Sequence, residues 1–194
     1  TVWRYNTSSM KYKRAGDGKI MKQMNAKQIT LAALAMALVC VSTMMIQIPI
    51  PLGYMHLGNC CILLFGVFFS KTIGTLAGGV GSCMADLLSG YPQWILPTLI
   101  IKGIMGYAIA AISKDKDGQV KMASWRTLAA SAAGIIIMIV GYTVAGIFLY
   151  GSVASGLAQI PGLTMEGVIG MILFYIIGFA FEAAKLPRLF QRNA

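Results

Sequence analysis

Charge is scarce in this chain of 194 residues, and acidic charge is scarcest. Charged residues make up 11% and hydrophobic residues 57%, whereas a soluble domain has about 25% charged residues. Only six residues are Asp or Glu, and the mean hydropathy is +0.73. This composition excludes an ordinary soluble domain and indicates a protein that lies mostly in lipid.

Enzyme signatures are also missing. With His56 as its single histidine, the chain has no Ser/His/Asp set and no HExxH metal site, and it contains no nucleotide P-loop. The four cysteines lie in apolar runs without metal-ligand spacing, which favours buried apolar residues over a disulfide framework. We predict no enzyme, no cofactor and no metal. Energy for uphill transport would come from another subunit or from an ion gradient.

Basic residues are absent from three of the gaps between apolar stretches. Residues 49–56, 89–93 and 150–164 contain no Lys or Arg, while the other connections and both ends hold fifteen of the sixteen. Lys and Arg gather on the cytoplasmic side of a bilayer, so we predict that both termini are cytoplasmic. The net charge is +10, and the basic residues behind it flank apolar stretches. The lipid bilayer is therefore the expected partner, and nucleic acid is not.

The apolar stretches predict an all-α integral membrane protein with six transmembrane helices. A spanning helix needs about 20 residues, so six leave no room for a second domain. We expect a polar, basic tail over residues 1–26, either disordered or foreign to the native chain, and a basic cytoplasmic end over residues 186–194. The membrane domain is expected over residues 27–185, with spans at residues 27–48, 57–69, 72–88, 93–112, 127–150 and 165–184.

Two prolines follow the first span. Pro49 and Pro51 are expected to end it, because proline lacks an amide hydrogen and clashes with the preceding turn. The segment IPIPLGYMHLGN would then form a structured outer loop.

Ionisable residues within or at the edge of spans are candidates for function. A charge at the bilayer centre costs about 2.5–3.5 kcal/mol on insertion scales. Glu182 lies near the inner end of the sixth predicted span, where a charge at the membrane interface is expected. Asp86, Lys102 and Glu166 share one depth in the outer half, which predicts a water-accessible pocket open to the outside. The alternative is an Asp86–Lys102 ion pair that only fixes helix packing, and the two interpretations are compatible.

Other polar and aromatic residues lie near the same depth. His56 and Asn59 flank the start of the second span, where His56 is either an interfacial loop residue or a ligand contact. Tyr and Trp gather at membrane interfaces, but a ring-shaped ligand would also stack on them. The sequence leaves both roles open for the aromatic residues at the outer edge: Tyr54, Tyr91, Trp94, Phe148 and Tyr150.

Several motifs in sequence order resemble the substrate-binding S component of energy-coupling factor (ECF) transporters, in the riboflavin-type subgroup. The resemblance covers residues 27–185. The motifs that carry it are His56-Leu57-Gly58-Asn59, the glycine-rich third span, Asp86-Leu87-Leu88-Ser89-Gly90-Tyr91, Lys102-Gly103 and Ile160-Pro161-Gly162.

This resemblance implies a six-helix protein of a prokaryotic plasma membrane that captures a vitamin or vitamin precursor from outside. It implies docking on a transmembrane T component that two cytoplasmic ATPases power. Family members use small residues of the first helix for this contact, and Ala33 and Ala37 have the required spacing. The loop after the first span is expected to cover the pocket.

The chain departs from the family in the expected ligand region. It has Gly58-Asn59 where the family often has Gly-Asp, and Leu163 and Glu166 where the family often has Asn and Gln. These changes suit a ligand with an amine or a ring nitrogen, and flavin, pyrimidine and pyridine compounds all remain open. The expected substrate contacts are Tyr54, His56, Asn59, Asp86, Tyr91, Lys102 and Glu166.

Two other functional classes remain possible. A standalone proton- or ion-coupled carrier would use Asp86 and Glu166 as titrating groups, although the small size and the missing inverted repeat argue against it. A membrane scaffold would bind no small molecule and would tolerate Asp86→Ala and Lys102→Ala.

Overall fold

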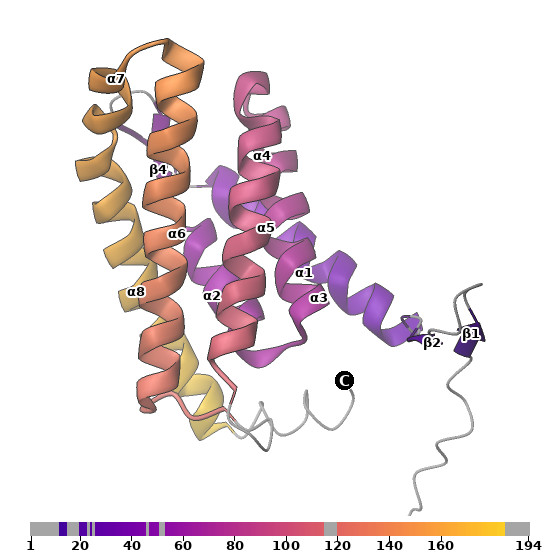
Figure 1. Ribbon diagram of the computed structural model, residues 1–194. Coiled ribbons are helices and arrows are strands. Elements are labelled where there is room, and N and C mark those ends of the chain that lie inside the picture. The colour runs from indigo at the N-terminus through magenta and orange to yellow at the C-terminus, as the bar shows by residue number, and fades with distance from the viewer. Residues whose placement is uncertain are drawn as a thin grey trace, which may run out of the picture.

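The computed structural model describes residues 12–14, 20–22, 24, 26–45, 47–50, 53–114 and 120–184, most of them in helices (Figure 1). A π-helix, η2 (Ala77–Gly81), joins α3 to α4 in one continuous run, and a 3₁₀ turn, η3 (Pro92–Trp94), leads into α5. The α-helices are α1 (Ala26–Met45), α2 (Gly58–Phe68), α3 (Lys71–Leu76), α4 (Ser82–Leu88), α5 (Ile95–Ile112), α6 (Trp125–Tyr150), α7 (Val153–Ala158) and α8 (Ile160–Ala183).

Four helical stretches of the described chain are long and apolar enough to cross a membrane. They are α1, η3 with α5, α6, and α7 with α8. Helix α2 is apolar but shorter. Many large apolar side chains on these helices are exposed, as expected where lipid is the solvent. These observations confirm an all-α membrane protein.

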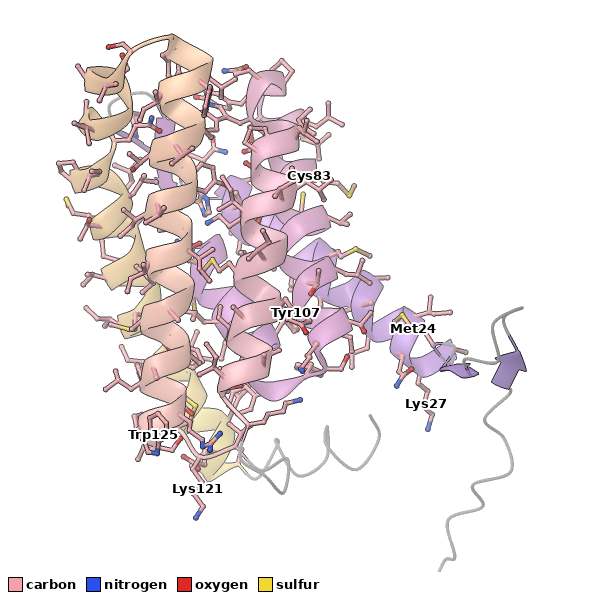
Figure 2. All side chains as sticks on the ribbon, viewed as in Figure 1. Met24, Lys27, Cys83, Tyr107, Lys121 and Trp125 are labelled. Carbon is pink, nitrogen blue, oxygen red and sulfur yellow. The ribbon has the colours of Figure 1, made fainter. Side chains whose placement is uncertain are left out.

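Helix α5 has a central place in the fold. It packs against α6 on one side and against the α3–η2–α4 run on the other, while α2 packs against both α5 and α8. Helix α1 runs obliquely to this group (Figure 1). Figure 2 shows Lys121 and Trp125 at the end of α6 opposite α7.

Local sequence fixes where the long helices begin and end. The Ser124 hydroxyl accepts a hydrogen bond from the Thr127 amide at 3.2 Å and caps the start of α6. Gly151 ends this helix in the left-handed region at φ 64°. Pro161 lies in the first turn of α8, where its missing amide hydrogen costs no helical bond.

The segment after α1 is a β-hairpin, which confirms a structured loop there. Strands β3 (Gln47–Ile50) and β4 (Gly53–His56) pair antiparallel, with Gln47 opposite His56. The prediction that the first span extends to Ile48 was wrong, because α1 ends at Met45 and the next residues take part in this pairing. Sequence analysis also missed α7, which lies in the connection read as an outer segment.

The predictions for the two ends of the chain fall largely outside the described residues. Two short strands, β1 (Tyr12–Arg14) and β2 (Ile20–Lys22), pair within the N-terminal tail. Other tail residues and residues 185–194 lie outside the described part, so the expectations about them stay predictions.

Glycines bring the η2 backbone against α5 at the position of Lys102. A Cβ on Gly78 would run into the carbonyl oxygen of Lys102, and one on Gly79 would lie 2.9 Å from the Leu99 carbonyl oxygen. Such close approach needs residues without a side chain. The π-helical turn therefore helps to set the position of α5 against the α3–η2–α4 run.

Candidate functional site

The Lys102 side chain lies at the centre of a buried polar cluster. It projects from α5 and is only 1% exposed. Its ammonium group donates to the Asn59 side-chain oxygen on α2 and to the Met138 sulfur on α6, the latter at 3.2 Å. The same nitrogen lies 3.6 Å from Oε1 of Glu166 on α8. One side chain thus contacts three other helices.

Glu166 is the acceptor at which these contacts converge. Its Oε1 accepts a hydrogen bond from Asn59 Nδ2 at 2.7 Å and lies 3.3 Å from His56 Nε2. Glu166 is 3% exposed and Asn59 is fully buried. Because a buried charge needs partners, this arrangement accounts for ionisable groups inside a membrane helix bundle.

His56 connects the hairpin to the cluster. Its Nδ1 accepts a hydrogen bond from the Gly58 amide at 3.0 Å, so the proton of the neutral ring is on Nε2, which faces Glu166. Burial, and then the charge of Lys102, holds the pKa of His56 well below its usual value. The end of β4 therefore contacts α8 through a neutral imidazole ring.

Aromatic and polar residues of η3, α5 and α6 extend the cluster. Lys102 Nζ lies 5.4 Å from the ring centroid of Tyr142, whose hydroxyl donates to Thr98 Oγ1 at 2.9 Å. The rings of Trp94 and Tyr142 are 5.5 Å apart. The sequence left two roles open for Trp94, at the membrane interface or against a ligand ring, and the structure buries it beside the cluster.

Sequence analysis missed three of these neighbours: Met138, Tyr142 and Thr98. A spacing of four residues was the available signal, because residues four apart share a helix face. Thr98 lies four residues before Lys102 on α5, and Tyr142 follows Met138 by four on α6.

Asp86 lies near the cluster, toward the C-terminal end of α4. It is 7% exposed and interacts electrostatically with both Lys102 and Glu166. Its carbonyl oxygen accepts from the Tyr91 amide at 2.9 Å, which places half-buried Tyr91 at the turn between α4 and η3. The Lys102–Glu166 pairing was not foreseen from the sequence.

The other residues predicted to have roles lie apart from these contacts. Tyr54 belongs to β4, but its side chain lies outside the described part. Ala33 and Ala37 are exposed on α1. Glu182 lies at the inner end of α8, where a side-chain oxygen accepts from the Met122 amide at 3.4 Å.

The arrangement is suited to binding. It combines an ammonium, two carboxylates, an amide and aromatic faces, which together can hydrogen-bond and stack on a polar ring. Among the described residues, His, Cys, Asp and Glu form no group of three that could hold a metal ion.

Known proteins are similar to this chain over most of its length. The family model described as the S component of the ECF-type riboflavin transporter matches residues 23–183. An uncharacterized protein of Pyrococcus woesei is 36% identical over 153 residues, which cover 78% of this chain and 99% of that protein. The thiamine precursor transporter HmpT of Lactococcus lactis is 26% identical over 180 residues, which cover 90% of this chain and 99% of HmpT.

Proposed function

Because the chain belongs to the ECF-type riboflavin transporter S component family, a family of transporter subunits and not of enzymes, we propose that it captures a vitamin or vitamin precursor for uptake. The observation that carries this proposal is the buried contact set of Asn59, Lys102 and Glu166 from three helices. A cluster of this kind inside a membrane protein is expected to serve a ligand or ion path.

The proposed topology has six crossings and cytoplasmic termini in a prokaryotic plasma membrane. The α3–η2–α4 run has 18 residues from Lys71 to Leu88 and, with α2, supplies the two crossings beyond the four long stretches. Basic residues at the ends opposite the hairpin support this orientation. They are Lys71, Lys114, Lys121 and Arg126.

Ligand would enter from the outer side and reach the cluster beneath the β3–β4 hairpin. The hairpin contacts the cluster through His56 and the outer turn through a 2.8 Å hydrogen bond from Gln47 to Ser89, so its release would open the site. A flavin, pyrimidine or pyridine ring would stack near Tyr142. The proposed contacts are Tyr54, His56, Asn59, Asp86, Tyr91, Lys102 and Glu166.

The energy for transport is proposed to come from two ATPases acting through a T component. The exposed Ala33 and Ala37 lie four residues apart on α1, and small side chains let another helix approach closely. This face of α1 is the proposed docking surface.

Mass spectrometry of the protein purified in mild detergent tests the capture function. We expect a vitamin or vitamin precursor to co-purify at near-equal stoichiometry, because a capture subunit retains its ligand. Unliganded protein that also shows no change in melting temperature with a vitamin panel would contradict the proposal. Dissipating the proton gradient without loss of uptake would further argue against a coupled carrier.

A further inference from the structure

The buried cluster contains more negative than positive charge. Lys102 supplies one ammonium, whereas Glu166 and Asp86 supply two carboxylates, and all three side chains are buried. Lys102 and Glu166 are 3.6 Å apart, and Asp86 interacts electrostatically with both. With each group in its ordinary ionised form, the cluster retains one negative charge.

The ring of His56 does not supply the missing positive charge. A ring nitrogen that accepts a hydrogen bond carries no proton, and Nδ1 accepts one from the Gly58 amide at 3.0 Å. Protonating this nitrogen would break that bond and place a second cation near Lys102. His56 therefore stays neutral beside Glu166, with Nε2 3.3 Å from Oε1.

No other charged side chain of the described helices and of the described residues between them lies at this depth. The remaining ones gather toward the other end, as Figure 2 shows for Lys27 and Lys121. Lipid and apolar helix faces surround the cluster, so water and salt screen its charge poorly. The full set of these distant residues is Lys27, Lys71, Lys114, Lys121, Arg126 and Glu182.

Glu166 is the group best placed to meet a ligand. The contacts from His56, Asn59 and Lys102 all involve Oε1. Among the contacts of the described residues, no donor reaches Oε2. A carboxylate accepts through both oxygens, so Oε2 offers an acceptor to a ligand N–H group.

We propose that this site selects a cationic ligand, such as a protonated amine, over a neutral or anionic ligand of the same shape, and that Glu166 determines this selectivity. A ligand cation would neutralise the excess of carboxylate over ammonium charge, whereas an anion would increase that excess in a low-dielectric environment. This inference rests on the proposed function and adds a ligand class to it.

Three compounds that share one pyridine ring test the inference: pyridoxamine, pyridoxine and 4-pyridoxate, with net charges near neutral pH of plus one, zero and minus one. Their affinities for the purified, ligand-depleted protein are measured by titration calorimetry. We expect pyridoxamine to bind about tenfold more tightly than pyridoxine, as a charge-assisted hydrogen bond allows, and 4-pyridoxate to bind most weakly.

Glu166→Gln, which preserves the shape of the side chain, should bring the pyridoxamine-to-pyridoxine affinity ratio close to one. Gly103→Ala is the matched control on α5, because its added methyl group meets its first neighbour only at 3.8 Å, and it should keep the wild-type ratio. An unchanged ratio in Glu166→Gln would overturn the role of Glu166.

The two proposals fail in distinguishable ways. If pyridoxine or 4-pyridoxate binds as tightly as pyridoxamine, or if the protein binds only a neutral flavin, charge selectivity is overturned while vitamin capture stands. If none of these compounds and no member of a wider vitamin panel binds, both proposals are overturned.

Discussion

At the scale of the residue, the account depends on a buried lysine that contacts several helices. Lys102 is among the largest fully buried side chains of the described residues, and Glu166 and Asn59 satisfy its ammonium group. Removing one member of a buried ion pair leaves the other charge uncompensated, which is usually more costly than removing both.

The Lys102–Glu166 pair predicts a non-additive effect on stability. Lys102→Met should lower the free energy of unfolding by about 3–5 kcal/mol, because Glu166 then loses its cation. Adding Glu166→Gln should restore part of this loss. Thermal unfolding in detergent measures both variants, and additive losses would contradict the pairing.

His56 predicts a dependence of stability on pH. The folded protein holds the pKa of this ring well below its usual value through burial and Lys102, although Glu166 faces the ring from the other side. The unfolded chain binds the proton near pH 6.5, so stability is retained above about pH 6.5 and decreases as the pH falls below it.

His56→Gln, which cannot protonate, isolates this contribution. As the pH falls from about 7.5 to about 5.5, the melting temperature of the wild type should decrease relative to that of His56→Gln. A difference that stays constant over this range would show that His56 titrates equally in the folded and unfolded chain.

At the scale of the element, glycine spacing determines how the α3–η2–α4 run meets α5. Gly78 and Gly103 lie in this same contact but differ in the room around them. A Cβ on Gly78 would run into the Lys102 carbonyl oxygen, whereas one on Gly103 would make ordinary contacts at 3.8–3.9 Å.

Gly78→Ala should therefore destabilise the protein and weaken ligand binding, because the added methyl group displaces the backbone of Lys102. Gly103→Ala should be close to neutral in both respects and serves as the control. Melting temperature and ligand affinity are the readouts. Equal behaviour of the two variants would mean that close approach at η2 does not position Lys102.

The sequence predicted most elements because long apolar runs leave few alternatives in a bilayer. It did not predict that α1 ends at Met45, since Pro49 suggested a later end and the hairpin pairing depends on residues further along the chain. Five members of the cluster were recognised as polar groups at or near one depth: His56, Asn59, Asp86, Lys102 and Glu166. The sequence did not predict that several contacts meet at Glu166 Oε1, because this depends on how α8 is rotated against α2 and α5.

At the scale of the whole molecule, the distribution of basic residues predicts which loops face which side. The four long helical stretches do not by themselves fix the count of crossings. Lys71, the first residue of α3, distinguishes six crossings from four, because six place it on the inner side.

Single cysteines in a cysteine-free variant test this topology with a membrane-impermeant maleimide on intact cells. Gln93→Cys at the outer turn should be labelled, while Lys71→Cys and Lys121→Cys should react only after the cells are opened. All three positions are exposed, so burial does not confound the comparison. Labelling of Lys71→Cys on intact cells would contradict the six-span topology.

The central claim is that the cluster around Lys102 is the place of vitamin capture, and Asn59 tests it most directly. Asn59→Leu has nearly the same shape but cannot hydrogen-bond to Lys102 or Glu166. The decisive measurement is the dissociation constant of the co-purifying compound for wild type, Asn59→Leu and the Gly103→Ala control, each checked for folding by its melting transition. The account predicts at least about a tenfold loss of affinity in folded Asn59→Leu and little change in the control. Wild-type affinity in Asn59→Leu would show that capture occurs elsewhere.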